Sequence, residues 1–331
     1  MSNLTTRPIG TIRLFGCGGG GINIAKEYAG EYASTDIARM SACYLDTSDS
    51  NLADDLVDNT FLFSNPDGNT DGSGKVKSTN AELIERSIPE VLRKFAPQDM
   101  NIIVYTASGG TGNVAGYYLH RKLLEAGHNV VSVVIGTSES ERTAKNTIGT
   151  LSSLSDLAAD LGKPVIFHYS HNARGVPRSK IDKEAHLIIT ALAFLCSRRN
   201  HGLDTADITS FLNYTQPRPD IRPSLARIHV YDDAKVFDEN IGEPVSVAYL
   251  TRNADEVQPE VFAPYSCDGT LPDVAQSKNL FFGIETKSLF KLLAETNAMK
   301  EELASREQAR IEAPSFGGGQ NTKTKGGLYL D

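Results

Sequence analysis

The chain has 331 residues, 22% of them charged and 40% hydrophobic, and 33 basic against 41 acidic residues give it a net charge of −8. This length is typical of about two globular domains. The acidic balance and the lack of any Lys/Arg-rich run argue against direct nucleic-acid binding, because phosphate neutralisation requires a basic patch.

The cysteines and the apolar segments argue against two further classes. The four cysteines have no C-x-x-C spacing and no neighbouring His cluster, so we expect reduced thiols, with neither a disulfide framework nor a zinc site. The segment Met1–Gly10 lacks the apolar core of a signal peptide. The longest mostly apolar stretch, Leu187–Cys196, is too short to span a bilayer. These features predict a soluble cytoplasmic protein with no membrane segment.

Short β-branched runs alternate with helical patterns through the first half of the chain. The expected strands are Thr11–Phe15, Met40–Leu45, Asn101–Ala107, Val130–Ile135 and Pro164–Tyr169. The expected helices between them are Asn23–Tyr32, Asn80–Phe95, Asn113–Ala126 and Thr143–Asp160. This alternation predicts an α/β fold, a doubly wound parallel sheet with helices on both faces.

The second half predicts a long central helix, a smaller α/β domain and a helical end. The central helix is expected at Ser179–Arg199, from an apolar stripe at helical spacing. The later strands are expected at Ala226–Tyr231, Val245–Thr251 and Asn279–Ile284, and the last helix at Lys287–Ile311. The residues after Ala313 are Gly-rich and polar, typical of a flexible tail. The predicted divisions are a first domain at 1–175, the central helix at 176–201, a second domain at 202–286, a C-terminal helix at 287–312 and the tail at 313–331.

A glycine-rich turn follows the first expected strand. The run from Gly16 to Asn23 contains four consecutive glycines, Gly18, Gly19, Gly20 and Gly21. Glycines let the backbone approach an anion closely, and a helix N-terminus favours negative charge, so phosphate is the expected ligand. Gly16, Gly18 and Gly21 also fit the G-x-G-x-x-G pattern of dinucleotide-binding domains. Asp46, at the end of the second strand, is placed to hold a ribose hydroxyl.

A second glycine turn separates two hypotheses. The strand Asn101–Ala107 leads into Ser108-Gly109-Gly110-Thr111-Gly112-Asn113. A dinucleotide domain has one such turn, after its first strand, whereas two turns on one parallel sheet can clamp a triphosphate from both sides. The run 108–112 resembles the tubulin signature G-G-G-T-G-[ST]-G, with Ser108, Asn113 and Val114 as departures at its edges. The sequence is therefore identified as similar to the tubulin/FtsZ family.

The resemblance implies a set of nucleotide-binding residues. The first loop of FtsZ corresponds to Gly18–Gly21 with Asn23, and its Asn-Thr-Asp loop corresponds to the segment that begins at Asp46. The loop that faces the γ-phosphate corresponds to Gly72, Ser73, Gly74 and Lys75. Glu139 or Glu141 corresponds to the acid that meets the ribose, and the Glu-x-x-x-Arg spacing favours Glu141, with Lys145 in place of the arginine. Asn172 and Asp182 would contact the base, although a capping or solvent-exposed role fits both residues as well.

Two aspartates after the central helix are the candidate catalytic residues. The segment that contains Asp204 and Asp207 resembles the FtsZ loop Asn-x-Asp-x-x-Asp, with Gly202 in place of the asparagine. Two aspartates at this spacing also form a common helix cap. The resemblance implies that these acids orient a water against the GTP of a neighbouring subunit, with Mg²⁺ bound through the phosphates. Head-to-tail contacts of this kind do not close, so they produce filaments.

The resemblance therefore implies an assembly-activated GTPase that binds GTP and GDP and associates with itself. Compact size, a degenerate signature and an unusual tail favour the bacteriophage and plasmid tubulins. A chain of that branch would work in the cytoplasm of a bacterial host, position or segregate phage or plasmid DNA, and reach an adaptor or cargo through its tail. Direct nucleic-acid and membrane contacts are not expected. The alternatives are an NAD-dependent Rossmann oxidoreductase and a nucleotide-binding adaptor without hydrolysis.

Overall fold

The computed structural model describes residues 9–29, 37–51, 54–64, 74–173, 175–253 and 258–312. One ten-stranded sheet runs through both halves, in the order β3-β2-β1-β4-β5-β6-β7-β10-β8-β9. Its strands are β1 (Thr11–Cys17), β2 (Arg39–Asp46), β3 (Thr60–Leu62), β4 (Met100–Thr106), β5 (Val130–Thr137), β6 (Val165–Asn172), β7 (Leu225–Tyr231), β8 (Ser246–Thr251), β9 (Tyr265–Thr270) and β10 (Asn279–Glu285).

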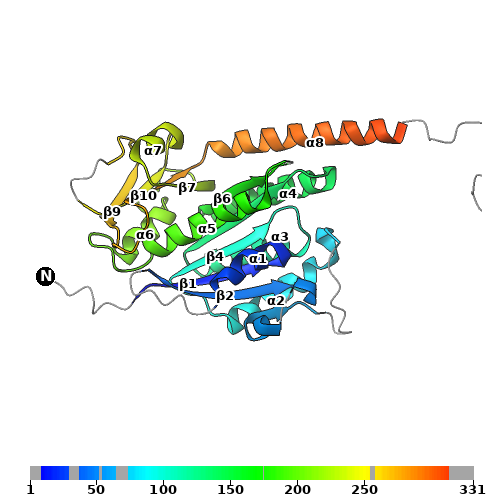
Figure 1. Ribbon diagram of the computed structural model, residues 1–331, viewed down its shortest axis with the longest axis horizontal. Coiled ribbons are helices and arrows are strands. Elements are labelled where there is room, and N and C mark those ends of the chain that lie inside the picture. The colour runs from blue at the N-terminus through cyan, green and yellow to red at the C-terminus, as the bar shows by residue number, and fades with distance from the viewer. Residues whose placement is uncertain are drawn as a thin grey trace, which may run out of the picture.

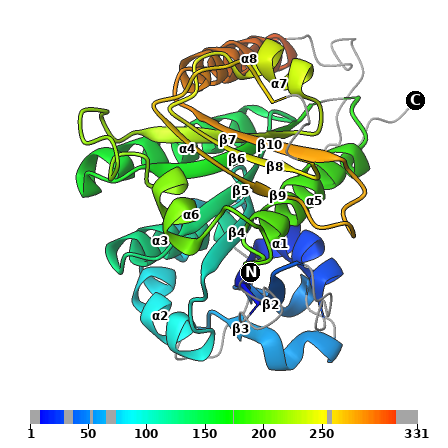
Figure 2. The same cartoon turned by 90° about the vertical axis from the view of Figure 1, so that its left-hand side faces the viewer.

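Helices cover both faces of this sheet (Figures 1 and 2). They are α1 (Gly18–Ala25), α2 (Ala81–Lys94), α3 (Thr111–Glu125), α4 (Glu141–Leu161), α5 (Arg178–Leu195), α6 (Thr205–Leu212), α7 (Ala234–Ile241) and α8 (Ser288–Glu312). The first seven strands in this sheet order, from β3 through β2 and β1 to β7, are mutually parallel. Strand β10 is antiparallel to β7 and β8. The predicted doubly wound α/β fold is confirmed.

Two hydrophobic cores lie on opposite faces of the sheet. Alternate residues of one strand enter different cores: Ile102 and Val104 of β4 pack with α1, α5 and α6, whereas Ile103 and Tyr105 pack with α2, α3, α4 and α8. This alternation follows from the pleat of a strand, which points successive side chains to opposite faces. A third, smaller core joins α7 to β8 and β10. A sheet buried on both faces explains the nearly continuous apolar runs of its strands.

The first helix differs from its predicted bounds. It was expected at Asn23–Tyr32, but α1 begins at Gly18 and ends at Ala25, where a short 3-10 helix follows. The glycines were assigned to a loop because glycine is a poor helix former. They enter the helix because it packs tightly on β4: a Cβ on Gly21 would lie 2.1 Å from the carbonyl oxygen of Val104.

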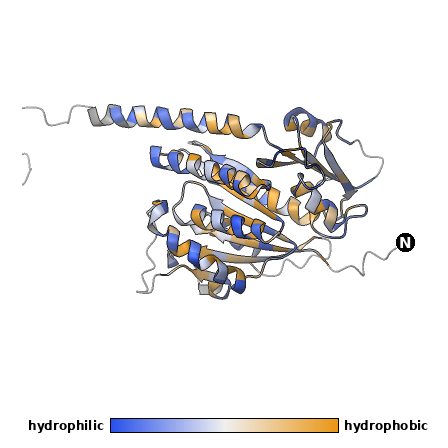
Figure 3. Cartoon of the chain, turned by 180° about the vertical axis from the view of Figure 1, so that it is seen from behind, coloured by the Kyte–Doolittle hydropathy of each residue, from blue (hydrophilic) through white to orange (hydrophobic). Residues whose placement is uncertain are grey.

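The C-terminal helix α8 packs against the body through its first turns. Leu289 and Leu292 are buried, and Thr296 is 1% exposed, whereas residues 297–302 are mostly exposed. Figure 3 shows the same trend, since the far end of α8 is mostly hydrophilic. The predicted tail, 313–331, lies outside the described residues. In the part of the chain that the structure describes, no helix is long and apolar enough to cross a bilayer.

Candidate nucleotide site

The two glycine turns lie side by side at the edge of the sheet where the parallel strands end. Strand β1 leads into α1 and its neighbour β4 leads into α3. A Cβ on Gly18 would lie 2.9 Å from the backbone nitrogen of Gly112, so the turns are in direct contact. Gly18 also has a φ of +66°, a left-handed conformation that L side chains rarely adopt. The sequence places glycine where this close approach requires it.

The helices that begin at these turns have no side-chain N-cap. Neither Cys17, before α1, nor Gly110, before α3, accepts a side-chain hydrogen bond, unlike Ser140, Asp204 and Asp233 before α4, α6 and α7. Helix N-termini carry unsatisfied N–H groups and a partial positive charge. Two such ends that meet at one point can both donate to the oxygens of a phosphate chain.

A cavity of about 250 Å³ lies beside the turns and is lined by several of the predicted binding residues. Its lining includes seven of them: Gly20, Asn23, Lys75, Ser108, Glu139, Asn172 and Asp182. They come from α1, the segment before α2, the second turn, the loop before α4, the end of β6 and the start of α5. The lining thus joins parts of the chain that the resemblance places in one site.

The loop that carries Lys75 is held to the second glycine turn by a residue that the sequence analysis missed. Asn146 of α4 donates from Nδ2 to the carbonyl oxygens of Lys75 and Ser108, at 3.1 Å each. Lys75 has a φ of 64° and Gly74 a φ of 55°. Gly72 and Ser73 lie outside the described residues. An asparagine inside an ordinary helical pattern gives no sequence signal for such a contact.

Lys77 is a second missed residue near the turn. Its Nζ donates to the carbonyl oxygen of Asn146 at 2.9 Å and to Thr150 Oγ1 at 2.8 Å. Burial lowers the pKa of Lys77 to about 8, since the charged ammonium is penalised away from water. Lys77 therefore packs against α4 through Asn146 and Thr150. Lys75, in contrast, lines the cavity.

The remaining residues of the second turn face inward. Asn113 is 3% exposed, and its Nδ2 donates to the carbonyl oxygen of Ala107 at 3.0 Å and to Thr150 Oγ1 at 3.3 Å. The Thr111 hydroxyl lies 2.7 Å from that of Thr47. These side chains brace the turn, and the N–H of Gly109 adds a bond to the carbonyl oxygen of Thr106 at 3.4 Å.

Asp46 and Glu141 are two of the predicted residues that do not line the cavity. Asp46, at the end of β2, is buried and accepts from the backbone N–H of Thr47 at 2.8 Å. Glu141 is the first residue of α4. Between the two glutamates, only Glu139 lines the cavity, where its carboxylate pairs with Arg178 at 3.4 Å. This geometry favours Glu139 over Glu141, whereas the sequence spacing favoured Glu141.

Asp204 and Asp207 belong to the start of α6, which lies at the end of the strands opposite the glycine turns (Figure 1). Asp204 is the N-cap of α6, and its Oδ1 accepts from the N–H groups of Ala206 and Asp207 at 2.7 and 2.9 Å. Asp207 in turn accepts from the N–H of Asp204 at 3.0 Å. This is the reciprocal capping box that was weighed as the alternative. The helix begins at Thr205, so Asp207 lies in its first turn.

Comparison with known proteins gives a consistent match. Residues 11–161 match the model of the Tubulin/FtsZ family, GTPase domain. A phage tubulin-like protein of Pseudomonas phage PhiPA3 is 29% identical over 296 residues, which is 88% of this chain and 90% of that protein. A phage tubulin-like protein of Pseudomonas phage phiKZ is 29% identical over 252 residues, 73% of this chain and 74% of that protein. A solved protofilament of TubZ from bacteriophage PhiKZ has 27% identity and a TM-score of 0.84, covering 97% of this chain and 99% of that one.

Proposed function

Residues 11–161 match the GTPase domain of the Tubulin/FtsZ family, and from this match we propose that the chain is a GTPase of that family whose hydrolysis requires head-to-tail assembly. The family binds guanine nucleotides, and the matched phage tubulin was solved as a protofilament. In such an assembly one subunit would bind each GTP, and Asp204 and Asp207 of the next subunit would help to cleave it. An NAD-dependent oxidoreductase does not fit this family match.

One observation carries the proposal: the two candidate half-sites lie at opposite ends of the same strands. Strands β1 and β4 end in the glycine turns. The segment that carries Asp204 and Asp207 lies where these strands begin (Figure 2). A single subunit therefore cannot bring its own acids to its own nucleotide. Stacking a second copy in the same orientation brings the acid-bearing edge of one copy to the turns of the other, and such a contact repeats without closing.

The chemistry requires positioning and charge neutralisation rather than covalent catalysis. The N–H groups at the starts of α1 and α3 would hold the phosphate oxygens, and Lys75 would add a positive charge at the cavity wall. The carboxylates of the arriving Asp204 and Asp207 would accept hydrogen bonds from the attacking water and orient it. Mg²⁺ would neutralise charge on the phosphates. We propose that this ion is bound chiefly through the phosphates of the nucleotide.

The proposed role is to position or segregate phage or plasmid DNA in the cytoplasm of a bacterial host. Support comes from the source of the relatives, which are phage tubulin-like proteins. The net charge of −8 makes an adaptor, bound through the tail at 313–331, a better link to DNA than direct contact. The domain boundaries given above remain predictions.

The experiment that tests the proposal separates the catalytic role of the acids from their capping role. Asp204→Ala removes both the charge and the cap, whereas Asp204→Ser keeps a good N-cap and removes only the charge. We expect both variants to bind GTP normally, to assemble, and to lose about 10²-fold or more of the hydrolysis rate, as for loss of a water-positioning group. Asp207→Ala should behave in the same way. The polymer should persist because its GTP is not cleaved.

Asp233→Ala is the matched control, because Asp233 caps α7 through the N–H of Val236 at 2.9 Å and lies outside the proposed site. This variant should lose a cap and keep its GTP turnover. Wild-type hydrolysis by Asp204→Ser would reduce the aspartates to helix caps and would favour a nucleotide-binding adaptor that does not hydrolyse GTP.

A further inference from the structure

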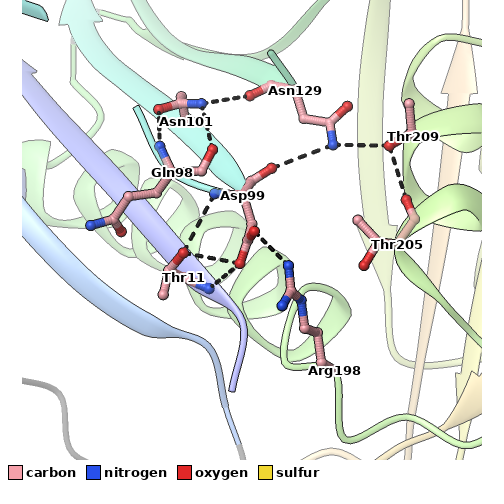
Figure 4. Close-up of polar contacts among 8 residues, drawn as sticks. All are labelled: Thr11, Gln98, Asp99, Asn101, Asn129, Arg198, Thr205 and Thr209. Carbon is pink, nitrogen blue, oxygen red and sulfur yellow. Dashed lines mark hydrogen bonds and ion pairs between the residues drawn. The ribbon is translucent and has the colours of Figure 1, made fainter. Parts of the chain in front are cut away.

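Asp99 fixes the beginning of β1 to the turn before β4. Its Oδ2 accepts from the backbone N–H and from the Oγ1 hydroxyl of Thr11, at 2.9 Å each (Figure 4). Thr11 is the first residue of β1, and Asp99 directly precedes β4. These are the two strands that end in the glycine turns. One carboxylate therefore joins both strands at the end away from the candidate nucleotide site.

The same carboxylate pairs with the loop that follows α5. Arg198 Nη2 donates to Asp99 Oδ1 at 2.5 Å, and both side chains are 30% exposed. Arg198 has a φ of 58°, a left-handed conformation that costs a non-glycine residue energy. Arg198 thus combines a strained backbone with a charge-assisted hydrogen bond, which indicates that its surroundings hold the loop in place. This loop leads directly to Asp204.

A second bridge from Asp99 reaches α6 on the other side of Asp204. Asn129 Nδ2 donates to the carbonyl oxygen of Asp99 at 3.4 Å and to Thr209 Oγ1 at 3.2 Å (Figure 4). Thr209 lies within α6, the helix that Asp204 caps. The segment 198–209 is thus attached to Asp99 at both ends, with the two acids between the attachments.

From this double attachment we propose that Asp99 and Arg198 are positioning residues for GTP hydrolysis. They would hold the acid-bearing segment in the orientation in which Asp204 and Asp207 meet the nucleotide of the adjacent subunit. The inference rests on the proposed function, since it assumes that these acids act on a neighbour. Hydrolysis depends steeply on placement: a displacement of about 1 Å can cost 10²-fold in rate.

Other contacts of the segment come from the second half of the chain, and one of them reaches an acid directly: the Tyr265 hydroxyl donates to Asp207 Oδ1 at 3.4 Å. His201 exchanges hydrogen bonds with Thr270, from its N–H to Oγ1 at 2.9 Å and from its carbonyl oxygen to the N–H of Thr270 at 3.0 Å. These bonds attach the segment to β9. The Asp99 network reaches the strands of the glycine turns, and beside it the N–H of Gly10, directly before β1, donates to the carbonyl oxygen of Ser197 at 3.1 Å.

Arg198→Gln and Asp99→Asn test the proposal, because each removes the ion pair with little change in size. We expect the GTP affinity of the monomer to stay within about twofold, while the maximal hydrolysis rate in the polymer falls about tenfold or more. Arg198→Lys keeps the charge and should recover part of the rate. Arg218→Gln is the control, because Arg218 forms an ion pair with Asp220 at the surface, away from the segment.

A mixing experiment distinguishes positioning of the acids from damage to the nucleotide site. Arg198→Gln is copolymerised with Asp204→Ala, and phosphate release is compared with that of each variant alone. If Arg198 positions the acids, no subunit presents a working segment and the mixture stays inactive. If Arg198→Gln instead impairs its own nucleotide site, its intact acids activate the Asp204→Ala subunits and the mixture recovers turnover, which overturns the proposal.

The hydrolysis rate of Asp204→Ala alone distinguishes a failure of the proposed composite site from a failure of the positioning role. Normal hydrolysis by that variant contradicts the proposed composite site. Loss of hydrolysis in Asp204→Ala together with a wild-type rate in Arg198→Gln contradicts only the positioning role.

Discussion

Gly18 and Gly112 touch through their backbones, although they belong to different glycine turns. A Cβ on Gly18 would lie 2.9 Å from the nitrogen of Gly112, and a Cβ on Gly112 would lie 2.5 Å from the carbonyl oxygen of Cys17. Real Cβ atoms do not approach backbone so closely, so the two turns form one unit that tolerates no added side chain.

Gly112→Ala should separate the two turns. The new methyl group must displace the backbone near Cys17, so we expect a loss of about 1–3 kcal/mol of unfolding free energy, as for overpacking. GTP affinity, measured by calorimetry, should fall about tenfold or more because the two sets of N–H groups no longer converge. Gly149→Ala is the control: its Cβ would lie 3.5 Å from Lys77 Nζ, inside helix α4, and it should keep GTP affinity. Equal affinity in both variants would refute the shared-unit interpretation.

Glu139→Gln should weaken GTP binding more than Glu141→Gln. Glu139 lines the cavity and Glu141 does not, so only the first substitution removes a carboxylate that can accept from ribose hydroxyls. Loss of a hydrogen bond to a charged group corresponds to about 1.5–3 kcal/mol. Titration with GTP and with 2′,3′-dideoxy-GTP measures the effect: Glu139→Gln should bind the two nucleotides with similar affinity. A larger effect of Glu141→Gln would restore the assignment that sequence spacing favours.

Asp182→Ala should reduce the preference for guanine. If Asp182 accepts from the base N1–H and N2–H groups, the wild type should bind GTP at least tenfold more tightly than ATP, about 1.4 kcal/mol. The variant should lose most of this difference. ITP, which lacks the exocyclic amine, should lose less affinity than GTP on substitution. Equal GTP and ATP affinities in the wild type would show that Asp182 and Asn172 do not read the base.

Lys77→Met should change how stability depends on pH. Burial lowers the pKa of Lys77 from 10.5 to about 8 in the folded state, so between these values the unfolded chain binds more protons. The contribution of Lys77 to the unfolding free energy therefore rises with pH from about 8 towards 10.5, and it is constant below this window. Urea unfolding at several pH values should show a steeper rise in the wild type than in the variant. Lys291→Met, at an exposed position of α8, should keep the wild-type slope.

Much of the fold could be predicted because the strands of the first half are short, apolar and separated by strong helical patterns. Strands β1, β2, β4, β5 and β6 match their predicted ranges closely. In the second half, β7, β8 and β10 also match their predicted ranges closely, but β9 was not predicted. Strand β9, Tyr-Ser-Cys-Asp-Gly-Thr, has Asp268 and Gly269 in its interior, both unfavourable for strands. It forms because β8 pairs with it along its whole length, a tertiary contact that local propensity does not encode.

The glycine turns were predictable because glycine has no substitute where two backbones meet. The supporting residues were not. Asn146 and Lys77 act through side chains that cross between elements, and Asp99 and Arg198 pair across 99 positions of the chain. Single polar residues of this kind are common on any surface, so only the three-dimensional contacts distinguish them. The capping box of Asp204 and Asp207 was foreseen as an alternative, and its presence leaves the catalytic role to experiment.

The glycine turns and the two aspartates, Asp204 and Asp207, lie at opposite ends of β1 and β4. This separation fixes how many complete active sites a filament contains. A filament assembled as proposed has one terminal subunit whose nucleotide meets no acids, and another whose acids meet no nucleotide. The number of complete sites is therefore one fewer than the number of subunits. A dimer would turn over GTP at about half the rate per subunit of a long filament, so the rate per subunit would report mean polymer length. GTP that survives at one tip would also give the two ends different lifetimes.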